Sequence, residues 1–128
     1  MIIDKNSVKK SVALGAILTA LAIILGAFGA HALKKILPAN MLETFLTGNR
    51  YHMFHGLSFI VVAMLELVFS INLKFVRNAF LIGMILFSGM CYIYALSGVK
   101  TFAMVVPLGG VAFILGWIVL AVQIYRNE

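Results

Sequence analysis

Four long windows without lysine or arginine constrain this chain of 128 residues more than any other feature. A helix needs about 20 predominantly apolar residues to cross the hydrocarbon core of a bilayer. None of the windows alternates with a period of two, as a strand of a membrane barrel would. Each is long enough for a transmembrane helix. The windows are Ser11 to Leu33, Tyr51 to Leu73, Asn78 to Val99 and Thr101 to Tyr125.

The composition agrees with a membrane protein. Hydrophobic residues make up 63% of the chain and charged residues 11%, whereas a soluble domain is nearer half apolar and a quarter charged. The net charge of +6 is explained by lysines and arginines in the short loops beside a membrane. Because the chain has no RNA-binding motif, we expect no nucleic-acid partner. We predict an all-α bundle that forms a single domain over residues 1–128. Its four transmembrane helices are expected near residues 11–33, 51–71, 77–97 and 103–125.

The first window has to be distinguished from a cleaved signal peptide. Lys5, Lys9 and Lys10 precede it, and the small residues around His31 look like a cleavage site. Its apolar core of about 20 residues is longer than the 7–15 residues of a signal peptide. We therefore predict that this helix remains in the mature protein.

Positive charges near the helix ends predict the orientation, because lysine and arginine are enriched on the cytoplasmic side. An inside N-terminus places six such residues inside and four outside. We therefore predict a multi-pass protein with both termini in the cytoplasm. The inner group is Lys5, Lys9, Lys10, Lys74, Arg77 and Arg126, and the outer group is Lys34, Lys35, Arg50 and Lys100.

The connection between the first two windows predicts a short helix of its own. Asn40 can cap a helix whose third residue is Glu43, an arrangement like a capping box, and Gly48 can end it. We expect an amphipathic helix in the outer interface of the membrane. An ordinary loop helix packed on the bundle is the alternative. The apolar face consists of Met41, Leu42, Phe45 and Leu46.

Small residues predict how the first helix packs, since they let helices approach closely where apolar burial in lipid gives little driving force. At about 100° per residue the helix has two small-residue stripes. We expect it to lie near the centre of the bundle, with His31 facing protein. The first stripe is Gly15, Thr19, Ala22, Gly26 and Gly29, and the second is Ala13, Ala16, Ala20, Ala27 and His31.

Polar side chains within the second and third windows are candidates for a buried site. His52, His55 and Glu66 lie along one broad face of the second helix. Ionisable groups at membrane depth normally face a bundle interior or a wet cavity. On the third helix, Ser88 and Tyr92 are four residues apart and can donate hydrogen bonds to neighbours.

The fourth window combines glycines with the only tryptophan. Pro107 is expected near the first turn of its helix, ahead of Gly109 and Gly110. Gly109 and Gly116 share one face and predict a packing seam. Trp117 is too deep for an aromatic belt on these boundaries, so its indole N–H needs a partner or a wet site.

Several short motifs together resemble a known family. They are LGAFGAHAL (Leu25–Leu33), Thr47 and Gly48 followed by Tyr51 and His55, LFSG (Leu86–Gly89) followed by Tyr92, Ala95 and Leu96, and the P-x-GGV-x-F-x-x-GW pattern (Pro107–Trp117). The chain resembles the small bacterial four-helix membrane proteins of domain-of-unknown-function family 423, over nearly its whole length. The resemblance implies an integral protein of the bacterial plasma membrane. It implies no activity, substrate or catalytic residue.

Histidines at the outer end of the bundle allow three interpretations. We predict that His31 and His55 lie close together and stabilise the first hairpin through hydrogen bonds. With His52 and Glu43 they could instead supply nitrogen and oxygen ligands to a transition metal, and two histidines could also hold a haem. No tight ligand motif such as H-E-x-x-H is present, so we predict no metal or other cofactor.

Glu66 separates two hypotheses for the function. It could carry a cation or proton in an oligomeric transporter, or it could pair with Lys74, Arg77, Trp117 or a tyrosine near the inner helix end. We prefer a structural or accessory protein that binds lipid or a partner membrane protein, with a homo-oligomer also open. No nucleophile and base stand at a recognisable spacing, so no enzyme is predicted.

Overall fold

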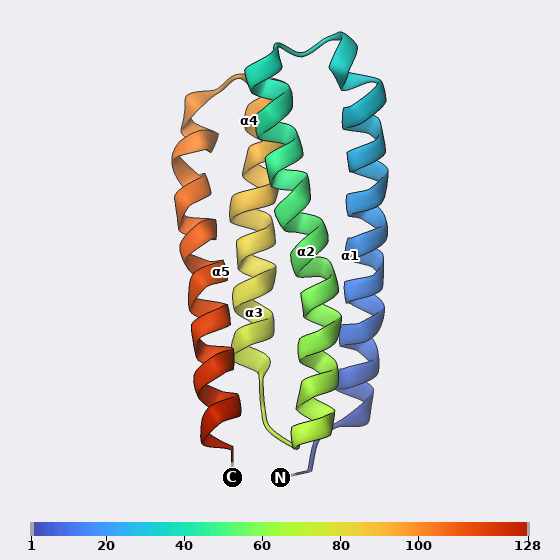
Figure 1. The fold of residues 1–128 in the computed structure, drawn as a ribbon, viewed down its shortest axis with the longest axis vertical. Helices are drawn as coiled ribbons and strands as arrows, with labels where there is room; N and C mark the ends of the chain where they lie inside the picture. The colour runs from blue at the N-terminus through green and yellow to red at the C-terminus, as the bar shows by residue number, and fades with distance from the viewer. Residues whose placement is uncertain (1, 128) are drawn as a thin grey trace.

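The computed structural model describes residues 2–127, which form helices side by side and no strand (Figure 1). Within that range, four helical spans are long and apolar enough to cross a membrane. The predicted fold class is therefore confirmed. The spans are α1 (Lys5–His31) with the short 3-10 helix η1 (Leu33–Lys35), α2 (Ala39–Phe69), α3 (Lys74–Gly83) continued by the π-helical η2 (Met84–Gly89) and α4 (Met90–Ser97), and α5 (Lys100–Arg126).

The spans are arranged so that α1 and α5 lie at opposite edges (Figure 1). The third span, α3–η2–α4, packs against both α2 and α5, whereas α1 packs against α2. Both chain termini lie at one end of the bundle, which we call the terminal end, and the connections η1–α2 and α4–α5 lie at the far end. A cluster of eight apolar residues forms the main core between α2, α3, η2 and α5. Its members are Phe59, Val62, Leu73, Val76, Phe80, Met84, Phe113 and Leu120.

The prediction that the first helix is central is wrong. Gly15, Ala22 and Gly29 of its first stripe are buried, but every member of its second stripe is exposed. Helix α2 is the central element instead, since 44% of its apolar window is buried against 17% for α1. Because α1 has α2 as its helical neighbour, it needs only one close-packing face. The second stripe, which includes His31, therefore points away from protein.

The predicted separate interfacial helix is also not present, because its residues are the first turns of α2. This helix begins after Pro38, whose carbonyl accepts hydrogen bonds from Met41 and Leu42. Gly48 does not end it. A Cβ there would lie 2.5 Å from the Cβ of Cys91, so this glycine serves close packing on the third span. Continuing the helix also keeps its backbone groups hydrogen-bonded where water is absent.

Glycines set the contact between the third span and α5. Gly109 and Gly116 are buried, and a Cβ on Gly116 would lie 2.6 Å from the Phe80 ring. At Gly109 a Cβ would overlap the backbone of Phe87. Pro107 lies seven residues inside α5, which begins at Lys100, so the prediction that it lies near the first turn is wrong. Proline is tolerated inside membrane helices when neighbours satisfy the freed backbone.

Candidate functional site: an aromatic groove between α2 and α5

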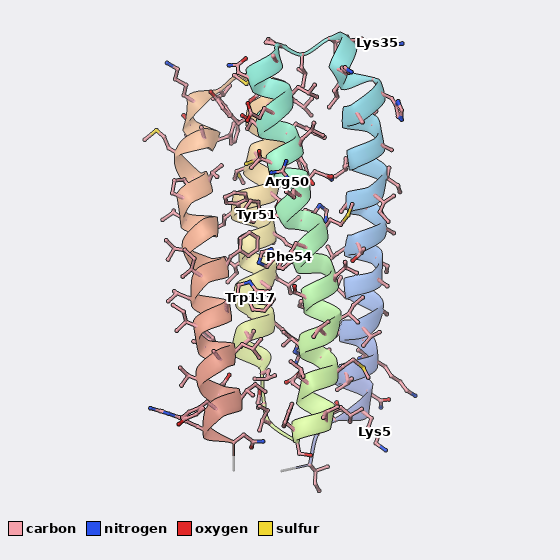
Figure 2. The ribbon with its side chains drawn as sticks, in the orientation of Figure 1. Lys5, Lys35, Arg50, Tyr51, Phe54 and Trp117 are labelled. Atoms are coloured by element: carbon pink, nitrogen blue, oxygen red, sulfur yellow. The ribbon has the colours of Figure 1, made fainter. Side chains whose placement is uncertain are left out.

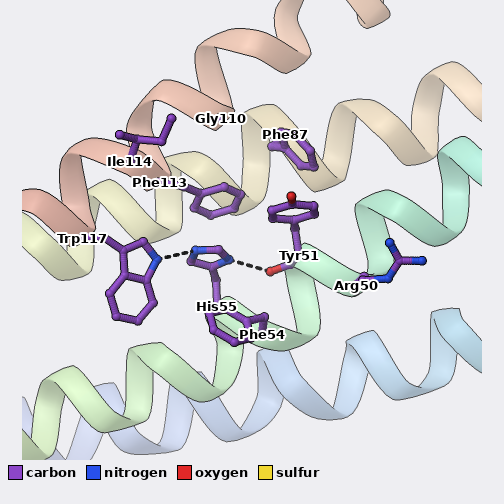
Figure 3. A pocket seen from close by; sticks show the side chains of 9 residues that line it. All are labelled: Arg50, Tyr51, Phe54, His55, Phe87, Gly110, Phe113, Ile114 and Trp117. Carbon is purple, nitrogen blue, oxygen red and sulfur yellow. Dashed lines mark hydrogen bonds between the residues drawn. The ribbon is translucent and has the colours of Figure 1, made fainter.

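A cavity of about 490 Å³ lies between α2, η2 and α5 (Figure 3). It exists because α2 and α5 both pack on the third span while their own backbones stay apart, so that side chains alone bridge them. Gly109 brings the α5 backbone against Phe87, and the adjacent Gly110 leaves the groove side without a side chain. We call this cavity the α2–α5 groove. Its lining residues are Arg50, Tyr51, Phe54, His55, Phe87, Gly110, Phe113, Ile114 and Trp117.

His55 forms the polar floor of the groove and has both ring nitrogens bonded. Its Nδ1 lies 2.8 Å from the carbonyl oxygen of Tyr51, and its Nε2 lies 3.1 Å from Nε1 of Trp117 (Figure 3). A carbonyl can only accept and an indole N–H can only donate, so Nδ1 carries the proton and Nε2 accepts. The ring also stacks on Phe113, with centroids 3.6 Å apart. His55 is therefore neutral and fully engaged.

His52 does not line the groove and bonds to Tyr92 of the third span instead. Its Nδ1 lies 2.9 Å from the hydroxyl of Tyr92. Asn49 donates to that hydroxyl at 3.2 Å and to the carbonyl oxygen of Ala22 at 2.7 Å. These hydrogen bonds join α1, α2 and α4 through one buried cluster. Sequence reasoning missed Asn49 because it placed this residue in a loop before the second helix.

His31 and His55 are not brought together, so the predicted hairpin contact is wrong. His31 is exposed at the end of α1, whereas His55 lies sixteen residues after Ala39. At 1.5 Å per residue that is roughly 24 Å along α2. The error follows from starting the second helix at Tyr51. Glu43 is exposed as well, and residues 2–127 contain no cluster of three or more His, Cys, Asp or Glu side chains suited to a metal ion.

Glu66 lies near the C-terminus of α2, at the terminal end of the bundle, and forms an ion pair. Its Oε2 is 2.7 Å from Nε of Arg77, and its Oε1 accepts from the backbone N–H of Leu73 at 2.7 Å. Arg77 also donates to the hydroxyl of Ser11. This network joins α1, α2 and the start of α3. Of the partners considered from the sequence, the structure pairs Glu66 with Arg77, while Trp117 bonds to His55 instead.

Ser88 lies in the π-helical segment and is almost fully buried, at 1% exposure. Its hydroxyl has no hydrogen-bond partner among the described residues. The backbone of this segment contacts Gly48 on one side. On the other side, Phe87 packs against Gly109 and lines the groove. The side chains predicted to form one polar site are thus spread over several places, of which the α2–α5 groove is large enough for a ligand of drug or lipid size.

Comparison with known proteins identifies the family. The family model described as "Protein of unknown function (DUF423)" matches residues 25–110. The chain belongs to this family. The UPF0382 membrane protein YwdK of Bacillus subtilis is 42% identical over 117 residues, covering 89% of this chain and 94% of the relative.

Other bacteria carry similar proteins. A UPF0382 membrane protein of Staphylococcus saprophyticus is 35% identical over 118 residues, covering 92% of this chain and 98% of its own. One from Haemophilus influenzae is 36% identical over 106 residues, covering 83% and 86%. No solved structure matches the chain. The chain is therefore a multi-pass bacterial membrane protein of a family without an assigned activity.

Proposed function

We propose that this protein is an accessory protein of the bacterial plasma membrane and that the α2–α5 groove binds one acyl chain of a membrane lipid. The observation that carries the proposal is an apolar, aromatic cavity of about 490 Å³ that opens on the side of the bundle facing lipid. Its size falls within the usual 300–1,000 Å³ of ligand pockets. Phe54 and Ile114 at its walls are 59% and 60% exposed, as lipid-facing side chains are.

The chemistry of the groove supports a binding role over a catalytic one. His55 is the buried polar side chain of the lining, and hydrogen bonds to Tyr51 and Trp117 use both of its nitrogens. A general base or metal ligand needs a nitrogen that is free to face the substrate or the metal. An acyl chain needs only apolar contact with the surrounding rings.

The transport hypothesis has weaker support. Glu66 would have to release Arg77 and the N–H of Leu73 before it could take up a proton or cation. It also lies three residues before the end of α2, roughly 5 Å along the axis, so it is at the border of the membrane. A carboxylate in that position stabilises the α2–α3 connection without any transported ion.

The orientation proposed from the charges places the terminal end in the cytoplasm. Lys5, Lys9 and Lys10 before α1 support it, as the first helix usually dominates topology. The far end, with Lys34 and Lys100, then faces outward. A C-terminal reporter that is active only in the cytoplasm should be active, and activity of an external reporter at either terminus would overturn this orientation.

A substitution at Gly110 tests acyl-chain binding. A Cβ there would meet only ring atoms of Phe87, at 3.7 and 3.9 Å, which is ordinary contact. Leucine should therefore be accommodated and should fill the groove. Native mass spectrometry in a mild detergent should detect one retained lipid on the parent protein and a loss of at least tenfold in Gly110→Leu.

The matched control is Val111→Leu, because Val111 neighbours Gly110 on α5 but is exposed and does not line the groove. This variant should retain lipid as the parent does. Equal retention by all three proteins would place the lipid elsewhere, and a parent protein that retains none would contradict the proposed function.

A further inference from the structure

We propose that Arg50 binds the phosphate of the lipid whose acyl chain lies in the α2–α5 groove, so that the ligand is a phospholipid and not a phosphate-free lipid. This inference rests on the proposed function and adds the chemical class of the ligand. It is carried by three observations on Arg50, namely its depth, its lack of a protein partner and its position at one end of the groove.

Arg50 lies deeper than a loop residue. It follows Ala39 by eleven residues in one unbroken helix, roughly 17 Å along the axis. The 31 residues of α2 span roughly 46 Å, and a hydrocarbon core of about 30 Å leaves about 8 Å outside at each end when the helix is centred. The Cα of Arg50 is then about 8 Å inside the hydrocarbon region, where a free charge is costly.

No protein group neutralises this charge. The guanidinium of Arg50 has neither an ion pair nor a hydrogen bond to any residue between 2 and 127, and its side chain is exposed. Of the acidic residues in that range, Glu66 is paired with Arg77, and Asp4 lies at the terminal end. Glu43 is two turns away on α2 and exposed. The groove therefore favours an anion and disfavours a cation.

The position of Arg50 suits a lipid phosphate. It lies at the end of the groove nearest the far end of the bundle, with its guanidinium extending away from Trp117 (Figures 2 and 3). A long arginine side chain in a membrane extends its charge toward the headgroup layer. Its planar guanidinium also pairs with phosphate oxygens through two parallel hydrogen bonds. The acyl chain then runs from Arg50 past Tyr51 and His55 to Trp117.

The single tryptophan of the chain supplies a probe inside the groove. Trp117 is 38% exposed and lines the cavity, so a brominated acyl chain bound there quenches its fluorescence on contact. We would titrate the protein in mild detergent with brominated phosphatidylglycerol and with diacylglycerol that carries the same brominated chains. The parent protein should bind the phospholipid at least about tenfold more tightly, because a single charge-assisted hydrogen bond already has that effect.

Variants at two arginines separate the phosphate contact from a general effect of charge. Arg50→Gln should lose the tenfold preference while both lipids still quench Trp117, and Arg50→Lys should keep part of it because lysine cannot pair bidentately. Arg126→Gln removes one positive charge at the opposite end of the bundle and should keep the full preference. Excess inorganic phosphate should not displace the brominated phospholipid.

The outcomes distinguish this inference from the proposed function. In one outcome both lipids quench Trp117 equally well and Gly110→Leu abolishes this quenching. That result would overturn the role of Arg50 and leave acyl-chain binding intact. Displacement by inorganic phosphate would assign Arg50 to a free anion and overturn the phospholipid. Absence of quenching by either lipid would refute both proposals.

Discussion

The two sides of α2 differ in how closely a neighbouring helix approaches. Toward α1, small residues face each other, and Gly15 and Gly56 leave no room for a Cβ against Ile60 and Thr19. Toward α5, aromatic rings take the place of small residues and a groove remains. In lipid, apolar burial does not drive helices together, so close packing depends on small residues and hydrogen bonds. The α1 side has both, while the α5 side has rings that a lipid chain can contact.

The largest effect is expected from a substitution that disrupts the close packing between α1 and α2. In Gly15→Leu, the new Cβ would lie 2.5 Å from Cγ1 of Ile60 and 3.2 Å from the carbonyl oxygen of Gly56. The backbone of α2 cannot move away locally, so we expect a loss of about 3 kcal/mol in the free energy of unfolding. Reversible unfolding in detergent measures it. Ala16→Leu at the exposed neighbouring position should cost little, and equal effects of the two would contradict the packing described.

An intermediate effect is expected where α1, α2 and α3 meet at the terminal end. Glu66→Gln removes the negative partner of Arg77 and leaves a largely buried guanidinium with one hydroxyl and a neutral amide. We expect about 2 kcal/mol of lost stability, as for a hydrogen bond to a charged group. Glu43→Gln changes the same charge at an exposed position and is the control. If both variants unfold alike, the ion pair contributes nothing to holding α1 and α3 on α2.

The four spans could be predicted from the sequence because a membrane-spanning helix depends on the length and apolar composition of its own segment. The same reasoning placed helix ends poorly. Gly48 reads as a helix end when α2 is considered alone, and only its contact with Cys91 on the third span explains why a glycine stands inside the continuing helix. That single error moved His55 from the fifth turn of α2 to the second, and with it the predicted contact with His31.

The candidate site could be predicted only in part for a related reason. The need of Trp117 for a partner was visible in the sequence, and so was Arg77 as a partner of Glu66. Which histidine Trp117 would meet was not visible, because helical spacing does not say which neighbour lies on each face. The second stripe of α1 shows the same limit, since small residues permit close packing but do not require it.

The smallest effect is expected from removing the hydrogen bond between Trp117 and His55, on the α5 side of α2. Trp117→Phe keeps a ring beside Phe80 but removes the indole N–H that Nε2 of His55 accepts. Hydrogen bonds between membrane helices contribute about 0.6 kcal/mol on average, and we expect that loss in the free energy of unfolding. A double-mutant cycle with His55→Phe isolates the pair, because the coupling energy should equal the loss. A coupling near zero would mean that His55 and Trp117 merely fill space. A coupling as large as the Gly15→Leu effect would mean that this side is as tightly held as the α1 side and would remove the reason to expect a lipid between α2 and α5.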